Sequence, residues 1–275
     1  MYIRRRTIYI CISALLGALC ASSCSIKEDR WPCPCWLVFH EDPESSIHPE
    51  GEFLVKVFPE GKAEEEKSIT MEWKSLQDDS YEVSVSKGYK TINLISGISR
   101  SVLSVSDLII SPGCQADSIY SCVGTVACLG EEAVVPVRMG KQFASVFLRM
   151  ENDSDSYPFS LRVSGMVDGV SLLSLLPHKG PFVVDCEPVV GENEFRFRLP
   201  RQKDGSLLLE LREKGAGADS PALETIPLGD YIIASGFDWT KVSLEDIYIG
   251  VDYARAGIRV KVNDWETVMQ VTEEI

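Results

Sequence analysis

The sequence has few histidines and none of the short motifs that build a catalytic centre. His40, His48 and His178 are its three histidines, and none of them lies in a motif that activates a nucleophile. There is no Gly-x-Ser-x-Gly elbow, no His-Glu-x-x-His pair and no glycine-rich phosphate loop. We therefore expect a protein that is not an enzyme and that needs no cofactor or metal. The alternative is a secreted hydrolase with a distributed carboxylate site, but the acidic clusters at 64–66 and 78–79 look like solvated loops.

Basic residues are also scarce. The chain has 27 Lys and Arg against 41 Asp and Glu, a net charge of −14. An acidic surface repels phosphate backbones, so we expect no nucleic-acid partner. No apolar stretch is long enough for a permanent membrane span.

The first 23 residues have the composition of a cleaved export signal. Three arginines at 4–6 precede the apolar run 7–19, and small residues at 21–23 stand directly before Cys24. This junction resembles the lipobox of bacterial lipoproteins, in which the cysteine receives lipid and becomes residue one. Cys20 is a weaker candidate because Leu19 before it is large. An ordinary secretory leader, with Cys24 as a disulfide partner, is the alternative.

Lipid on Cys24 would hold a soluble domain on a membrane without a spanning helix, since each buried CH₂ contributes about 0.8 kcal/mol. Lys27, Glu28 and Asp29 follow the cysteine and look like the acidic surface-export signal of bacteroidete lipoproteins. We expect a surface-exposed, lipid-anchored protein of the outer membrane.

Six further cysteines follow Cys24, and an even number in an exported chain suggests disulfides, although six allow 15 pairings. Cys122 and Cys128 would lie about 20 Å apart on one strand and should have different partners. We expect at least one of Cys33 and Cys35 to reach Cys114, Cys122 or Cys128. Zinc at Cys33, Cys35, His40 and His48 is a weaker alternative, because one residue between the cysteines is too few. The possible disulfide residues are Cys33, Cys35, Cys114, Cys122, Cys128 and Cys186.

Period-two alternation recurs in short runs separated by turn residues, and it predicts an all-β protein. One helical turn is expected in 100–110 and another in 242–247. The strands expected lie at 36–40, 53–58, 83–85, 89–95, 120–128, 133–137, 143–150, 159–164, 195–199, 207–211, 231–235, 247–253 and 258–262.

The length suggests two β-sandwich domains after the leader. The polar run 151–156 separates the strand that ends at Met150 from the next one, so we predict a first domain over 24–150 and a second over 151–275. An Asp-x-Asp pair in this run lacks the glycine and distal glutamate of a calcium loop. We interpret the run as a linker.

Exposed tryptophans could stack on sugars, which makes a glycan-binding or host-ligand-binding surface lipoprotein the main alternative function. Trp239 and Trp265 lie among strand-like segments and are expected in the core, whereas Trp31 and Trp73 are open candidates.

Several motifs, taken in order, resemble the bacteroidete fimbrial anchor lipoproteins of the FimB type. They are Cys24 with Glu28-Asp29 and Cys33-Pro34, then the segments 141–146, 165–170, 199–202 and 227–231, and the terminal Trp265. The resemblance covers nearly the whole mature chain. The run of cysteines at 114, 122 and 128 departs from it.

The resemblance implies two tandem transthyretin-like β-sandwiches, lipidated at Cys24, at the base of a fimbrium. The expected partners are stalk or accessory pilins, joined by strand addition, and the outer membrane. Related stalk fimbrillins lose their N-terminal strand to a trypsin-like protease. Cleavage at Arg30 would release lipid but little of any strand, so the resemblance favours an anchor over a stalk or tip subunit.

Overall fold

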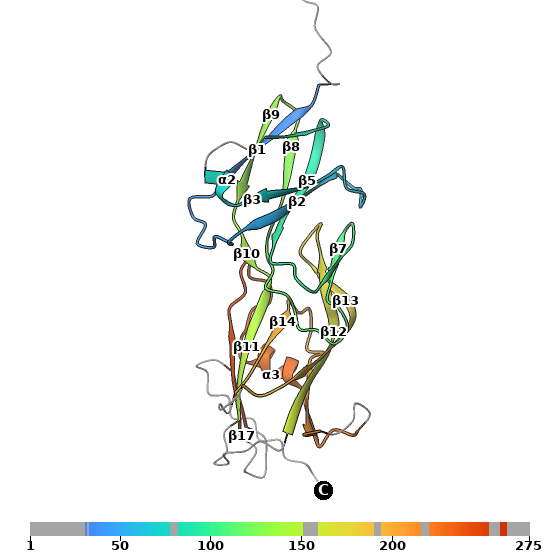
Figure 1. The fold of residues 1–275 in the computed structure, drawn as a ribbon, viewed down its shortest axis with the longest axis vertical. Helices are drawn as coiled ribbons and strands as arrows, with labels where there is room; N and C mark the ends of the chain where they lie inside the picture. Colours follow the sequence, from blue (N-terminus) through green and yellow to red (C-terminus); the bar gives the residue numbers. More distant parts are fainter. Residues whose placement is uncertain are drawn as a thin grey trace, which may run out of the picture.

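The computed structural model describes residues 31, 33–77, 82–150, 159–189, 194–215, 220–252 and 259–262. Over these residues the regular structure is almost entirely β-strand, which confirms the all-β class. The strands form four sheets, arranged as two sandwiches that follow one another along the long axis of the molecule (Figure 1). No helix in this part of the chain is long and apolar enough to cross a membrane.

The first sandwich packs a three-stranded sheet against a five-stranded sheet. β1 lies at the centre of the smaller sheet, antiparallel to β4 and parallel to β9. The short helix α2 (Lys74–Gln77) follows β3. The smaller sheet has the order β4 (Glu82–Val85), β1 (Cys35–Glu41), β9 (Glu132–Val137), and the larger β10 (Gly140–Lys141), β8 (Tyr120–Cys128), β5 (Gly88–Ser96), β2 (Glu52–Pro59), β3 (Lys67–Glu72).

Alternation along the strands explains why they form this sandwich. In β1, Leu37 and Phe39 are buried, whereas Val38 between them is more exposed. In β9, Val135 and Val137 face inward, while Val134 is 60% exposed. Successive side chains of a strand point to opposite faces, so each sheet presents one apolar face to the other.

The second sandwich is built in the same way. β11 lies between β14 and β17 in one sheet, and the long strand β12 organises the other. β13 pairs with one side of β12, and β15 and β7 share the other side. The first sheet is β14 (Glu194–Pro200), β11 (Phe143–Met150), β17 (Ile247–Asp252), β18 (Arg259–Val262); the second is β16 (Glu224–Ile226), β15 (Leu208–Glu213), β12 (Phe159–Ser171), β7 (Asp107–Ile109), β6 (Val102–Leu103), with β13 (Pro177–Cys186) beside β12.

The chain crosses between the sandwiches before the first one is complete. β6 and β7 come between β5 and β8 in sequence, but β7 pairs with β12 of the second sandwich. Leu108 of β7 is buried in a small cluster with Phe58 and Ile95 of the first sandwich and Val170 and Leu172 of the second. Asn93 also donates a buried hydrogen bond of 2.7 Å to the Leu172 carbonyl. The two sandwiches therefore share a packed junction.

The pairing of β11 corrects one expectation. The strand at 143–150 was expected to close the first domain, but it pairs with β14 and β17, and Val146 and Leu148 lie in the second core. Buried and exposed residues of this strand would alternate in the same way in either sandwich. The sequence pattern therefore could not show which strands it pairs with. The predicted linker 151–156 lies outside the described residues.

Three local predictions were wrong. Residues 231–235, expected as a strand, lie mostly in helix α3 (Leu228–Ala234), where Leu228, Tyr231 and Ile232 bury one helical face. The segment 100–110 forms β6 and β7 instead of a helical turn, because β12 offers it an edge. Residues 242–246 form bends and irregular structure, and β17 starts at Ile247.

Candidate functional site

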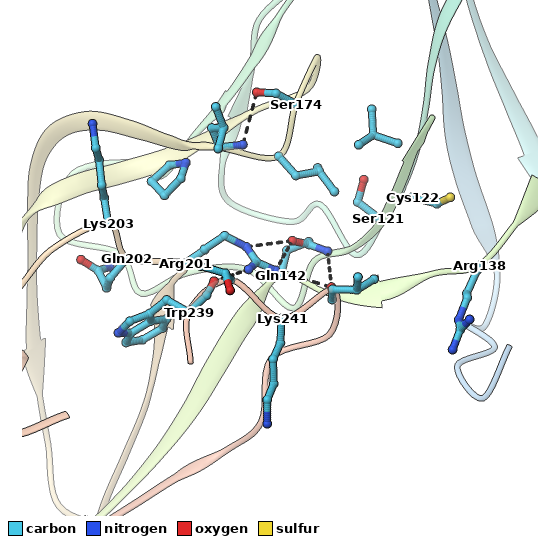
Figure 2. A pocket seen from close by; sticks show the side chains of 16 residues that line it. Ser121, Cys122, Arg138, Gln142, Ser174, Arg201, Gln202, Lys203, Trp239 and Lys241 are labelled. Carbon is cyan, nitrogen blue, oxygen red and sulfur yellow. Dashed lines mark hydrogen bonds between the residues drawn. The ribbon is translucent and has the colours of Figure 1, made fainter. Parts of the chain in front are cut away.

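A cleft of about 550 Å³ lies at the junction of the two sandwiches (Figure 2). Its volume is in the range of small-ligand pockets. Both sandwiches contribute, so the site exists only in the assembled molecule. Its lining residues are 121–123, Arg138, Gln142, 174–177, 201–203 and 239–242.

Arg201 fixes the floor of this cleft. It follows directly after β14 and is 8% exposed. Its Nη2 and Nε donate to Gln142 Oε1 at 2.9 and 3.2 Å, and its Nη1 donates to the Trp239 carbonyl. Figure 2 shows this guanidinium at the centre of the cleft. One side chain thus joins the end of β14, the start of β11 and the loop 239–242.

Gln142 and Gly140 complete the link. Gln142 Nε2 donates to the carbonyls of Gly140 and Val242 at 3.0 and 3.2 Å. A Cβ on Gly140 would stand 2.3 Å from the Val242 carbonyl oxygen, so glycine permits this close approach. Leu244 N–H also donates to the Lys141 carbonyl at 2.9 Å. The loop is therefore held firmly against β10.

The charged side chains that line the cleft are all basic, although the chain is acidic. Its described lining includes Arg138, Arg201, Lys203 and Lys241 and no Asp or Glu. Burial lowers the pKa of Arg201, although nearby Asp238 partly opposes this shift. The guanidinium hydrogen-bonds to neutral oxygens. A concave site lined by one sign of charge attracts ligands of the opposite sign.

Two of these cations have partners at the rim. Arg138 pairs with Glu44 at 2.9 Å, and Lys241 pairs with Glu245 at 2.6 Å, both among exposed side chains. Such exposed pairs are weak, so an incoming anion can compete for the cations.

The opposite wall is apolar and locally strained. Leu175 has a φ of 58°, and it is the one residue other than glycine with positive φ among those described. Leu176 and Val242 beside the cleft are 64% and 71% exposed. Strained backbone is often found at functional sites, and exposed apolar side chains favour contact with a ligand.

The lining suits binding better than catalysis. Ser121, Ser174 and Cys122 carry nucleophilic atoms, but no described lining residue is a histidine or carboxylate that could serve as their base. Burial raises the pKa of the Cys122 thiol, which keeps it protonated. The arrangement can hold an anionic group and an apolar or planar one side by side.

Among the described residues that the sequence predicted as site residues, Cys122 lines the cleft and the others lie outside it. Cys24 and the leader 1–23 lie outside the described residues. All six later cysteines are thiols here. Cys33 is exposed, Cys35 and Cys128 lie in the first core, and Cys186 lies in the second, with Cys114 packed against it. Within the described ranges, no three His, Cys, Asp or Glu residues cluster as metal ligands.

The described tryptophans differ in how far they are buried. Trp239 is 9% exposed, which confirms its expected burial, and Trp73 is buried against Phe53. Trp31 and Trp36 are 63% and 40% exposed. Trp265 lies outside the described residues.

The cleft was not predicted from the sequence, although two sequence motifs contain residues that line it. Two of the motifs noted for their resemblance, 141–146 and 199–202, are far apart in sequence and meet through the Gln142 to Arg201 hydrogen bonds. Their order in the chain could be read, but their contact depends on the pairing of β11 with β14.

No protein-family model and no curated protein matches the chain. Several solved structures are similar to the chain. The fimbrial anchor protein Mfa2 from Porphyromonas gingivalis superposes with a TM-score of 0.65 at 12% identity, over 86% of this chain and 100% of that one. A proposed adhesin from Bacteroides ovatus gives 0.62 at 15%, over 90% and 99%. A proposed polysaccharide-binding protein from Bacteroides thetaiotaomicron gives 0.61 at 13%, over 87% and 99%. At these identities the likeness shows the fold.

Proposed function

We propose that this chain is a non-enzymatic fimbrial anchor subunit of the FimB type, tethered to the outer membrane by lipid on Cys24. The observation that carries the proposal is the shared two-sandwich fold, which spans 86% of this chain and the whole of a fimbrial anchor protein. The lipobox-like junction at Ser23 and Cys24 supports the anchor role over that of a soluble adhesin.

Strand addition from a pilin is the proposed means of attachment. It needs a strand whose outer edge is unpaired, and β9 pairs with β1 alone among the described strands. Trp36 N–H donates to the Glu131 carbonyl, and Asp42 N–H donates to the Val137 carbonyl, so odd-numbered residues of β9 face β1. Val134 and Pro136 therefore turn their backbone outward. A proline is tolerated in a strand at just such a position.

The anchoring role is tested in the cell. Cys24→Ala should move the protein from the membrane fraction to the soluble fraction, and deletion of the chain should release fimbriae into the medium. Ser25→Ala is the matched control and should change neither. Unchanged attachment of fimbriae in the deletion strain contradicts the proposal, as does a Cys24→Ala protein that stays in the membrane.

The strand edge is tested by Val134→Pro. Proline removes an outward N–H without touching a hydrogen bond to β1, so the fold should persist while co-purification of pilin falls at least about tenfold. Val134→Ala keeps the N–H and should retain the pilin. Equal pilin recovery from both variants excludes β9 as the joining edge.

A second candidate function is binding of an acidic saccharide in the interdomain cleft. The four cations of its lining favour it, and one fold relative is described as a proposed polysaccharide-binding protein. Calorimetric titration with oligogalacturonate should give binding that a neutral oligosaccharide does not. Lys203→Glu should abolish it, whereas Lys179→Glu, the same charge change at an exposed site outside the cleft, should not. Equal effects of the two variants contradict the candidate.

A further inference from the structure

Two cysteines from facing sheets meet inside the first sandwich. Cys35 is the first residue of β1 and Cys128 the last of β8, and both are fully buried in the same core. β1 and β8 belong to different sheets, yet some of their Cα atoms come within 8 Å of each other. The Cys35 thiol also contributes to the raised pKa of the Cys128 thiol, so the two groups lie near each other in this core. A disulfide requires two cysteines that approach closely from facing elements.

Local backbone pairing explains how the two thiols come together. Trp36 N–H donates to the Glu131 carbonyl at 2.7 Å, and Trp36 pairs in register with Glu132. The β8 to β9 connection therefore folds over the start of β1. Cys128, three residues before Glu131, is brought to the residue that precedes Trp36.

The other cysteines do not compete for this pairing. Cys33 is exposed, and Cys122 lies on β8 six residues before Cys128, beside the cleft. Cys186 belongs to the second core, with Cys114 packed against that core. The sequence left 15 pairings open among six cysteines, and the fold selects one partner for Cys35.

We propose that Cys35 and Cys128 form a disulfide in the exported protein. This disulfide covalently links the two sheets of the first sandwich. The two thiols give up two protons and two electrons by thiol–disulfide exchange, and the disulfide of a protein or small-molecule oxidant is reduced to two thiols. The inference rests on the export step of the proposed function and not on fimbrial attachment.

The chemistry of the site places this oxidation during folding. Burial, together with the neighbouring Cys35, raises the pKa of the Cys128 thiol to about 12. A thiol that is neutral and buried reacts slowly, so the folded, reduced protein should resist oxidation, and the finished bond should resist reductant. The bond closes a loop that contains β2 to β7, and it holds β1 at the centre of its sheet.

The first test is a thiol map of the full chain extracted from the cell envelope. Free thiols are trapped with an alkylating reagent in denaturant without reductant, and peptides are analysed by mass spectrometry. The peptides of Cys35 and Cys128 should be linked, with two hydrogen atoms less than their sum. Alkylation of both residues, or a link from either to another cysteine, overturns the proposal.

The second test uses the purified protein and involves neither membrane nor fimbrium, so it is independent of the anchor role. Refolding with reductant should lower the unfolding midpoint of the natural chain by about 10 °C relative to refolding with oxidised glutathione. The Cys35→Ala/Cys128→Ala variant should show no such difference, whereas Cys186→Ala, at another buried thiol, should keep it. Equal responses in the natural chain and the double variant overturn the proposal, and they do so whether or not the double variant is itself less stable.

Discussion

Asp117 is a buried carboxylate at the junction of the two sandwiches, 2% exposed. Four donors converge on it: Ser99 N–H and Oγ–H, Arg100 N–H and Ser101 N–H, at 2.5 to 3.1 Å. Burial raises the pKa of this carboxyl, but the hydrogen bonds outweigh burial and hold the pKa well below its usual range. The residue thus fixes the turn that leads the chain into β6.

Asp117→Asn should lower the free energy of unfolding by about 3 kcal/mol at neutral pH, because a neutral amide replaces the charged acceptor and brings donors of its own. Denaturant titration measures the change. Asp204→Asn is the control, since Asp204 is exposed and accepts a hydrogen bond from Ser206 in a surface turn. It should have little effect. A similar loss in both variants would contradict the role given to Asp117.

The same carboxyl makes stability depend on pH. Below about pH 4 the unfolded chain binds a proton at this position that the native chain does not, so the contribution of Asp117 falls as pH falls toward its native pKa. Titrations between about pH 7 and about pH 3 should show the natural chain and Asp117→Asn converging in stability at the acid end. A constant difference would show that the native pKa is not lowered.

At the scale of elements, the joint between β10 and the loop 239–242 depends on the absence of a side chain. Gly140→Ala would place Cβ against the Val242 carbonyl, a backbone group that cannot move without losing its bond from Gln142. We expect a loss of about 2 kcal/mol in stability and a change in Trp239 fluorescence. Gly124→Ala in β8 is the control, because nothing lies within 4 Å of its Cβ. Equal losses would rule out this steric explanation.

Most strands were predictable because their alternation is local. β1 and β9 each bury every second side chain, and short-range pattern reveals that. β13 was missed because Gly180 and Pro181 look like a turn, although β12 pairs with the strand. β12 runs seven residues further than expected, to Ser171, through irregular register near Gly165 and Gly169. In these segments, hydrogen-bonded pairing with neighbouring strands determined the structure more than local composition did.

The cleft was less predictable than the strands. Arg201 and Gln142 are separated by 59 positions, and each looks like an ordinary polar residue at a strand end. Their contact follows from the relative placement of β14 and β11. The buried meeting of Cys35 and Cys128 depends in the same way on how two sheets face each other, so sequence could name the cysteines but not the pair.

At the scale of the whole molecule, the buried cluster around Leu108 should make the two sandwiches unfold together. Calorimetry of the natural chain should show a single transition. Phe58→Ala removes a fully buried side chain from the cluster, and it should cost about 4 kcal/mol and separate the transition into two. Val102→Ala in the neighbouring exposed strand β6 should leave one transition. Two transitions in the natural chain would contradict this coupling.

The detour of the chain through β6 and β7 constrains how a gene for such a molecule can be rearranged. A crossover placed just before β11 would give the downstream half no strand to lie beside the end of β12, and it would leave the upstream half with a hairpin that has no sheet to join. Neither half is a self-sufficient module. Exchange between paralogues by recombination should therefore favour whole chains over swapped halves, and diversity should accumulate in loops and outward-facing strand positions.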